Sequence, residues 1–250
     1  MPGHEWFCAR AEAEIARMAS VAAGASPGTP VPSCPGWTMA KLVKHTGIVH
    51  RWAGHIVATR ARARTEQRDI EAGLPADEAA YPRWLAAGAA PLAAALRSAG
   101  PDTVVWAWGA EQRSGWWARR MLHETTVHRA DAELALGAWP DIDPVAAADG
   151  IEEFLANLPA ARRPSQRLAE LPAGKSLHLH ATDSDGEWLV RFGAGGVEWS
   201  RGHEKASAAV RGPAAALLLF TYGRIPGSDA RLAVSGDAAL LDTWQEKTAL

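Results

Sequence analysis

The sequence predicts a fold of two parts, a bundle of four helices followed by a small α+β domain. Long stretches of the N-terminal half are rich in helix-forming residues and repeat apolar side chains at the spacing of one helix face. The composition changes near residue 140. From residue 176, short segments in which apolar and polar residues alternate are separated by Asp-Gly and Gly-Gly turns. At 250 residues the chain is long enough for two small domains, which we expect at residues 1–165 and 174–250.

Capping residues and breakers set the expected helix ends. The four expected helices span residues 5–23, 38 to about 64, 78–98 and 114–137. Thr38 is suited to cap the second, because its hydroxyl can accept a hydrogen bond from an unpaired backbone N–H. The third ends before the breaker Gly100-Pro101, and Gly137 is suited to end the fourth. Four helices of this length are what a helical bundle requires.

The C-terminal part alternates between short strands and helices. Residues 139–159 read as a loop and a short helix, and residues 162–175 as a linker. The expected strands lie within residues 176–183, 186–193, 196–201, 205–212 and 231–237, and the expected helices within 213–224 and 238–246. The helix that opens with Pro213 is expected to be amphipathic, with one face on the sheet. This order of elements predicts a small α+β domain.

Composition and charge exclude several classes of partner. The formal net charge is -2, so no basic field would attract nucleic acid or an anionic membrane. No run approaches the roughly 20 apolar residues of a membrane span. The first residues carry charge where a signal peptide would be apolar, so we expect a cytoplasmic protein. Two cysteines are too few for a disulfide framework, and Cys34, between prolines, is expected to be a small buried thiol.

The stretch MLHETTVHRAD, residues 121–131, concentrates polar side chains within the fourth expected helix. His123 and His128 are five residues apart, about 140° around a helix, and cannot bind one ion together. The zinc-protease motif needs two histidines four residues apart, so that interpretation fails. Glu124 and His128 are four residues apart and project together from one helix face.

The face that carries Glu124 and His128 is otherwise apolar. Its neighbouring positions are Trp117, Met121, Ala132 and Ala135. A carboxylate on such a face costs free energy to bury unless a cation or a donor compensates it. Asp131 could accept a hydrogen bond from His128 as support for a metal ligand, or could face solvent. An alternative interpretation without a metal also remains open. In it Glu124 lies at the edge of the surface and pairs with Arg120, and His128 is a core residue.

The second expected helix supplies a third candidate ligand. Its buried seam, at spacings of three and four residues, is Leu42, His45, Val49, Trp52 and Ile56. His45 stands where an apolar residue is expected, whereas His50 is turned away and is expected to be a surface or packing residue. A single histidine on an apolar face is more often a hydrogen-bonded core residue. Nevertheless, two helices that each present ligand side chains inward are how bundle metal sites are built.

His45, Glu124 and His128 together form a set of two histidines and one carboxylate. Three protein ligands leave a coordination position open, which is the arrangement of a catalytic zinc site. The ligand types also suit Fe(II), Mn or Ni, so the sequence predicts a divalent metal site without fixing the ion.

The segments around these residues, PSCPGWTMAKLVKHTGIVHRWA and WWARRMLHETTVHRADAELALG, resemble the two signature segments of the mycothiol-dependent maleylpyruvate isomerase family. That family belongs to the wider DinB-like four-helix metalloenzymes, and the region from about residue 174 is similar to the family's C-terminal domain. The resemblance implies a zinc ion held by one histidine of the second helix and a glutamate and a histidine of the fourth. These positions fall on His45, Glu124 and His128.

The resemblance further implies a mycothiol-dependent enzyme that acts on an electrophilic small molecule. A bound divalent cation lowers the pKa of a thiol, so that a thiolate could attack an electrophilic carbon at neutral pH. Expulsion of the thiol after rotation would give isomerisation, as of maleylpyruvate, and release of the intact adduct would give thiol S-transfer. Arg120 is a candidate anchor for a substrate carboxylate, with a surface position or a salt bridge as alternatives.

Two other hypotheses concern different parts of the chain. A non-catalytic metal- or small-molecule-binding regulatory protein could use the same scaffold, with a groove at the apolar helix of residues 215–223, although core packing is the favoured account of that helix. His178 and His180 share one face of an expected strand and could hold a second metal. With no third ligand visible nearby, we expect them to be polar residues on the solvated side. No pattern indicates the oligomeric state.

Overall fold

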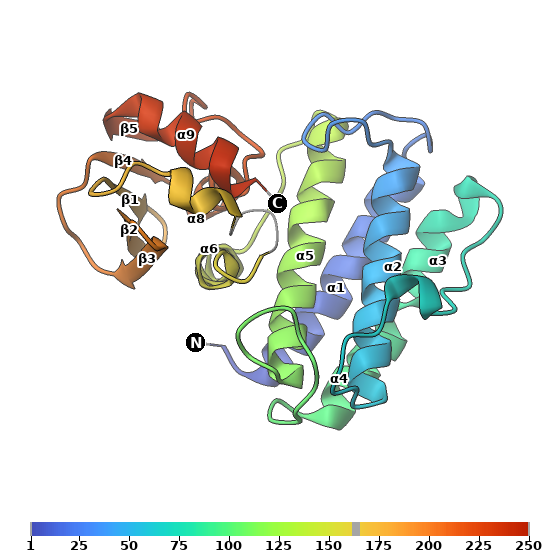
Figure 1. Cartoon of the computed structure of the whole chain (residues 1–250). Helices are drawn as coiled ribbons and strands as arrows, with labels where there is room; N and C mark the ends of the chain where they lie inside the picture. Colours follow the sequence, from blue (N-terminus) through green and yellow to red (C-terminus); the bar gives the residue numbers. More distant parts are fainter. Residues whose placement is uncertain (1, 162–165, 250) are drawn as a thin grey trace. The chain divides into compact units, whose positions relative to one another are not determined.

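The computed structural model describes residues 2–161 and 166–249, which form two compact units (Figure 1). The first unit spans Met1–Pro140 and the second Asp141–Leu250. The first is helical and the second holds a mixed five-stranded sheet with helices, so the expected fold class, a helical bundle followed by an α+β domain, is confirmed. None of the helices in the described part of the chain combines the length and the apolar character that a membrane crossing requires.

The helices of the first unit follow the prediction, with changes at their ends. They are α1 (His4–Ala23), α2 (Met39–Ala58), α3 (Tyr81–Ala87), α4 (Ala89–Ala99) and α5 (Ser114–Ala135), with short 3-10 turns at Gln67–Asp69 and Glu78–Ala80. Thr38 caps α2 as expected, and its hydroxyl accepts a hydrogen bond from the Lys41 N–H at 3.4 Å. α5 packs against both α1 and α2, so the two helices expected to carry ligands are neighbours.

α2 ends at Ala58, earlier than the expected end near residue 64. Arg60 adopts a left-handed conformation with φ 51°. The Ala61 N–H then bonds the Ile56 carbonyl at 3.0 Å, and the Arg60 N–H bonds the Val57 carbonyl at 3.2 Å. This pair of bonds is the Schellman pattern, which satisfies the last carbonyls of a helix. The helix-forming Ala and Arg residues that follow therefore lie outside α2.

The single helix expected at residues 78–98 is two helices separated by Gly88. Pro91 has no backbone N–H and is tolerated in the first turn of a helix but not in its interior, so it favours a new helix start here. Arg51 of α2 donates to the Trp84 carbonyl at 2.8 Å, and its guanidinium lies 3.9 Å from the centre of the Trp84 ring. These contacts hold α3 against α2.

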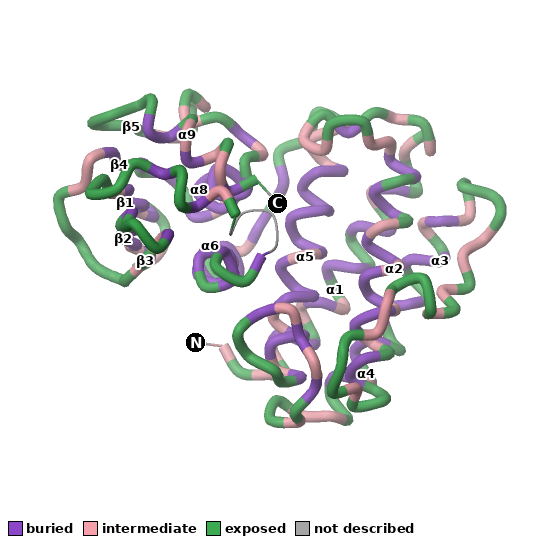
Figure 2. Tube along the Cα trace, in the orientation of Figure 1, coloured by how far each residue is buried: buried purple, intermediate pink, exposed green. Residues whose placement is uncertain are grey.

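The core of the first unit lies where the apolar faces of its helices meet (Figure 2). The apolar members of the predicted α2 seam, Leu42, Val49, Trp52 and Ile56, are all buried. Gly47 lies where α3 approaches α2, and a Cβ at that position would come within 2.1 Å of the Trp84 ring. The absence of a side chain at Gly47 thus lets the indole pack against the α2 backbone.

We expect Gly47→Ala to lower the free energy of unfolding by about 1–3 kcal/mol, because the added methyl group would overlap the Trp84 ring. Gly54→Ala is a matched control in the same helix. Its Cβ would meet Leu92 at 3.7 Å, an ordinary contact, so its better helix propensity should raise stability by up to about 1 kcal/mol. Urea unfolding followed by circular dichroism measures both effects. Equal stability of the two variants would contradict this packing.

The second unit begins with α6 (Pro144–Asn157), whose N-cap Asp143 accepts hydrogen bonds from two backbone N–H groups of the first turn. α6 packs against α8 and belongs to the unit that contains the sheet. The sequence had instead predicted that residues up to 165 belong to the helical bundle. Of the linker expected at residues 162–175, residues 162–165 lie outside the described residues, and the remainder contains a 3-10 turn at Leu168–Glu170.

The strands and helices expected after residue 174 are present. They are β1 (Ser176–Ala181), β2 (Glu187–Gly193), β3 (Gly196–Arg201), β4 (Ala208–Gly212), α8 (Ala214–Thr221), β5 (Ala233–Gly236) and α9 (Ala238–Thr248). The sheet order is β3-β2-β1-β4-β5, with β1 and β4 parallel and the other neighbours antiparallel. Leu177, Leu179 and Val210 mark the fully buried face of the sheet, and His178 and His180 lie on the opposite face.

α8 is buried on nearly every side, so the prediction of an amphipathic helix is wrong. All of its residues except Ala215 are buried. α8 packs against α6 and also against β1 and β4, and apolar neighbours on several sides favour a helix that is apolar all round. Core packing therefore accounts for this apolar segment.

Candidate metal centre

α2 and α5 bring the three predicted ligands together. His45 Nε2 lies 3.1 Å from Glu124 Oε1, and His128 Nε2 lies 3.3 Å from the same oxygen. One ligand atom from each residue lies within 4.8 Å of the others. Two imidazole nitrogens and a carboxylate oxygen around one point are a donor set that fits a divalent transition metal. The His45 side chain is 36% exposed, so the cluster opens to solvent on that side.

Helix periodicity decides which residues of α5 take part. Glu124 and His128 are one turn apart and meet His45 of α2. His123 packs in the other direction, with its ring 6.4 Å from that of Phe7 in α1. It belongs to none of the ligand clusters found among the described residues. The geometry therefore agrees with the exclusion of a His123–His128 pair.

Arg120 is a buried partner of Glu124. Its Nη2 donates to Glu124 Oε2 at 3.0 Å, and its side chain is 4% exposed. This is the salt bridge that the sequence left open as an alternative to a substrate anchor. Because Oε2 receives this bond, Oε1 faces the two histidines, and the guanidinium compensates the carboxylate charge. A substrate carboxylate would have to share the guanidinium with Glu124 to use Arg120 as an anchor.

Asp131 is fully buried and bonded to His128, which excludes the solvent-facing alternative. Its Oδ2 accepts a hydrogen bond from His128 Nδ1 at 2.9 Å. Because Nδ1 donates to Asp131, Nε2 is left to face Glu124. Ser33 Oγ donates to Asp131 Oδ1 at 2.7 Å, and Cys34 Sγ donates to Oδ2 at 3.3 Å. A carboxylate behind the second ring nitrogen is the usual support of a metal-binding histidine.

The loop before α2 folds into a tight turn over the cluster. The Trp37 N–H bonds the Cys34 carbonyl at 2.9 Å, across a turn with Pro35 in second and Gly36 in third position. Gly36 has φ 79°, and the third position of a type II turn requires a positive φ. Trp37 follows directly, at the end of this turn.

Ser33, Cys34 and Trp37 contribute to the site, and the sequence did not predict that they would. The Trp37 ring lies 5.0 Å from the His45 ring and 6.1 Å from the His128 ring. Cys34 is half-buried and hydrogen-bonded, where a buried inert thiol had been expected. The only signal in the sequence is the density of Pro and Gly before α2. It predicts a turn but does not indicate which side chains the turn brings to the site.

Cys34, His128 and Asp131 form a second set of ligand-type atoms that shares His128 with the first. Asp131 is fully buried and already accepts bonds from Ser33, Cys34 and His128 Nδ1. His128 Nε2 and Glu124 Oε1, by contrast, lie on the partly exposed side of the cluster. We therefore place the candidate metal among His45, Glu124 and His128.

Burial and hydrogen bonds together set the charges of the cluster. Burial by itself lowers the pKa of His128, but its hydrogen bonds, foremost that with Asp131, outweigh burial and hold the pKa well above its ordinary value. Burial by itself raises the pKa of Glu124, but the bonds from His128 and His45 hold it well below its ordinary value. Glu124 is therefore an anion at neutral pH, and a cation that binds beside it must displace the proton on His128.

His50 is a packing residue, one of the two outcomes expected for it. Its ring is buried, and its Nε2 donates to Thr125 Oγ1 at 2.8 Å. The Thr125 hydroxyl itself donates to the Met121 carbonyl at 2.6 Å, so its oxygen is the acceptor for the imidazole. Burial lowers the pKa of His50 to about 3, which keeps the ring neutral.

We expect Asp131→Asn to lower the pKa of His128 and to weaken metal binding about 10–100-fold. The raised pKa of His128 means that its protonation stabilises the metal-free protein fully below the unfolded-state pKa of about 6.5. This contribution is lost as the pH rises through the folded-state pKa, well above 6.5. In Asp131→Asn the pKa of His128 should be lower, so the stabilisation that protonated His128 contributes should be lost at lower pH. NMR titration of His128 and a Zn²⁺ titration measure the two effects.

Ser33→Ala is the matched control for Asp131→Asn, because it removes one hydrogen bond to the same carboxylate and leaves the charge in place. It should change the pKa of His128 much less than Asp131→Asn does. An unchanged His128 titration in Asp131→Asn would show that this carboxylate does not set the charge of the ring.

Two protein-family models match the chain. The model described as mycothiol maleylpyruvate isomerase N-terminal domain matches residues 8–133, and the model described as MDMPI C-terminal domain matches residues 146–243. No curated protein sequence matches the chain significantly.

Two similar solved structures cover nearly the whole chain. A crystal structure of the mycothiol-dependent maleylpyruvate isomerase is 19% identical, with a TM-score of 0.60, and a histidine-to-alanine mutant of the mycothiol-dependent maleylpyruvate isomerase is 17% identical, with a TM-score of 0.62. Each match covers 94% of this chain and 93% of the other. At these identities the likeness shows a shared fold.

Proposed function

The chain belongs to the mycothiol maleylpyruvate isomerase family, and on that premise we propose that it is a mycothiol-dependent metalloenzyme acting on an electrophilic small molecule. The observation that carries this proposal is the convergence of His45, Glu124 and His128 on one partly exposed point. A half-buried carboxylate with two imidazoles and an opening to solvent suits a catalytic cation better than a structural one.

The residues around these three ligands would prepare the site for a metal. Arg120 fixes Glu124 Oε2, so that Oε1 stays directed at the histidines. Asp131 holds His128 Nδ1, so that Nε2 is presented as a ligand. A divalent cation, Zn²⁺ in our proposal, would lower the pKa of a thiol at this place and supply a thiolate at neutral pH. The Trp37 ring lies edge-on to the His45 ring and stacks with the His128 ring, so it bounds the cluster on that side.

The reaction that we propose is addition of the thiolate to an unsaturated electrophilic carbon. The sulfur lone pair forms a C–S bond while the π electrons move onto the neighbouring carbonyl. If the carbon chain rotates and the C–S bond breaks again, the outcome is cis–trans isomerisation with no net consumption of thiol. If the C–S bond remains and the enolate takes up at carbon the equivalent of the proton that the thiol lost, the outcome is S-transfer. Neither Cys8 nor Cys34 takes part in a disulfide bond, which suits a reducing compartment, and we propose a cytoplasmic location.

Mycothiol with a panel of electrophiles that includes maleylpyruvate tests the proposed function directly. For the Zn²⁺-loaded protein we expect product formation that requires mycothiol. Unchanged total thiol would identify isomerisation, and stoichiometric loss of thiol would identify S-transfer. Glutathione in place of mycothiol, and protein without added metal, are the controls. No reaction of any electrophile with the metal-loaded protein would count against the proposal and favour a binding or regulatory role.

A further inference from the structure

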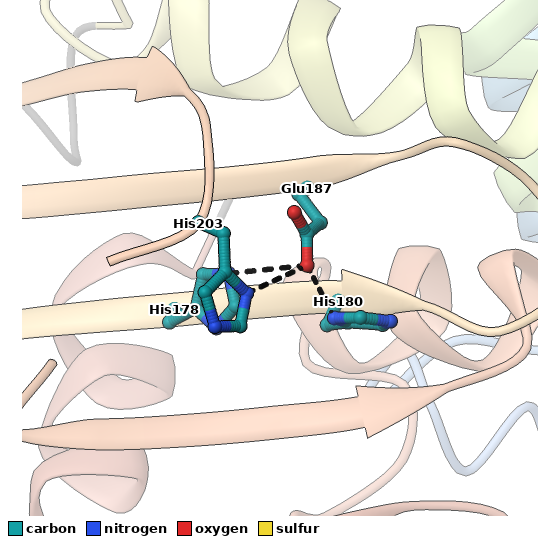
Figure 3. Close-up of side chains that lie close together, drawn as sticks. All are labelled: His178, His180, Glu187 and His203. Atoms are coloured by element: carbon teal, nitrogen blue, oxygen red, sulfur yellow. Dashed lines mark hydrogen bonds and ion pairs between the residues drawn. The ribbon is translucent and has the colours of Figure 1, made fainter. Parts of the chain in front are cut away.

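The sheet of the second unit gathers four ligand-type side chains on one face (Figure 3). His178 and His180 project from the same face of β1, because side chains two residues apart share a face. Glu187, the first residue of β2, lies directly opposite His180 in the antiparallel register. His203 comes just after the end of β3, the other neighbour of β2. Three segments of the chain thus contribute to one group, the four-residue cluster.

A single carboxylate oxygen lies at the centre of the four-residue cluster. Glu187 Oε1 is 2.5 Å from His180 Nδ1, 2.9 Å from His203 Nδ1 and 3.9 Å from His178 Nε2. One ligand atom from each of the four residues lies within 4.8 Å of the others. Metal–ligand bonds of about 2.0–2.2 Å place ligand atoms about 3–4 Å apart, so small side-chain shifts would accommodate an ion.

His178 directs a buried nitrogen toward this cluster. The residue is 6% exposed, and its Nε2 has no hydrogen-bond partner within the described ranges. A buried ring nitrogen without a partner is costly unless something binds it. Burial lowers the pKa of His178, and the hydrogen bond from His203 lowers the pKa of Glu187. At neutral pH these two groups are therefore an imidazole and a carboxylate, the forms that bind metal.

We propose that His178, His180, Glu187 and His203 bind one divalent transition-metal ion, in a site separate from the candidate centre of the first unit. Three imidazoles and one carboxylate suit Zn²⁺, whereas Ca²⁺ and Mg²⁺ prefer all-oxygen ligands. Four protein ligands are typical of a structural zinc site. The expectation that His178 and His180 have no further ligand nearby is therefore wrong, because the sheet brings Glu187 and His203 to them.

The ion would fasten the segment between β3 and β4 to the sheet. His203 lies in this segment and is the exposed member of the cluster, with 74% of its side chain accessible. The next residue, Glu204, is held from the sheet side by Arg191, whose Nη2 lies 2.8 Å from both carboxylate oxygens. This contact keeps the backbone at His203 near β2, so that a metal needs to order only one side chain.

Zn²⁺ stoichiometry of the untagged full-length protein tests the proposal independently of the proposed function. Elemental analysis after Zn²⁺ loading and gel filtration should give two ions for each chain. His180→Ala/His203→Ala should bind one, His45→Ala should bind one, and the combined variant none. Glu187→Gln keeps the shape of the side chain but removes the charge of a direct ligand. Loss of a residue that only supports a ligand lowers metal affinity roughly 10–100-fold, and Glu187→Gln should lower the Zn²⁺ affinity of the second site by more than that. His55→Ala, on exposed helix surface, should bind two.

Trypsin gives a second readout, because Lys205 lies two residues after His203 in the exposed segment. Zn²⁺ should slow cleavage after Lys205 in the wild type and in His45→Ala, and should have no effect in His180→Ala/His203→Ala. Equal Zn²⁺ content of the wild type and His180→Ala/His203→Ala would overturn the second site. Unchanged Zn²⁺ content in His45→Ala would instead overturn the first site, so the two failures are distinguishable.

Discussion

Replacing His45 by alanine is expected to remove the metal ion from the first unit and to abolish turnover. His45 is the sole ligand that α2 contributes to the proposed set, and the two α5 ligands alone leave an incomplete site. A catalytic metal supplies several kcal/mol of stabilisation, so the activity should fall on the order of 10³-fold or more. Elemental analysis in the His180→Ala/His203→Ala background, together with the mycothiol-dependent assay, measures both losses.

His55→Ala is the matched control, since His55 lies on the same helix with an exposed side chain. It should retain metal and activity. The helical circular dichroism signal of His45→Ala should stay close to that of the wild type, because the buried apolar side chains of α2, among them Leu42 and Ile56, keep their packing. Retention of the first-unit metal in a folded His45→Ala protein would show that the ligand assignment is wrong.

Arg129→Met is expected to lower the free energy of unfolding by about 3–5 kcal/mol. Arg129 of α5 is fully buried, and its guanidinium pairs with Glu14 of α1 and with Glu133, each at 2.5 Å. Burial raises the pKa of Glu133, so this carboxylate already resists ionisation. Removal of the cation would leave two carboxylates with little solvent between α1 and α5. Urea unfolding at pH 7 measures the loss.

Arg17→Ala is the control for Arg129→Met, because Arg17 pairs with the same Glu14 from the surface. That pair spans 3.2 Å, and the Arg17 side chain is 42% exposed, so its removal should cost about 0–1 kcal/mol. Adding Glu14→Gln and Glu133→Gln to Arg129→Met should recover part of the stability, since no buried charge then remains unpaired. Similar destabilisation by Arg17→Ala and Arg129→Met would contradict the difference in burial.

Much of the candidate site follows from the sequence, because helix and strand periodicities are local. The spacing of four residues between Glu124 and His128 requires that they share a face of α5, and the seam spacing directs His45 inward from α2. The same kind of argument placed His178 and His180 on one face of β1. The resemblance to a known family named the same three ligands in the bundle.

Two helix ends differ from the prediction although their causes are local. α2 ends at a cap on Arg60, and Pro91 favours the break at Gly88 between α3 and α4. Other features depend on contacts between segments that are distant in the chain. The roles of Ser33, Cys34 and Trp37 depend on the turn that folds them onto Asp131 and the histidines. The spacing of residues along the sequence does not indicate that this turn brings the three side chains onto the site.

The sequence alone determined most of the helical and strand elements, the N-cap at Thr38 and the faces on which His45, Glu124, His128, His178 and His180 lie. Only the tertiary structure decided that Asp131 is buried behind His128, that Arg120 pairs with Glu124, and that Glu187 and His203 join the two histidines of β1. Backbone geometry repeats over a few residues and can be read from a pattern. Which faces meet depends on how the whole chain packs, and no local pattern records that.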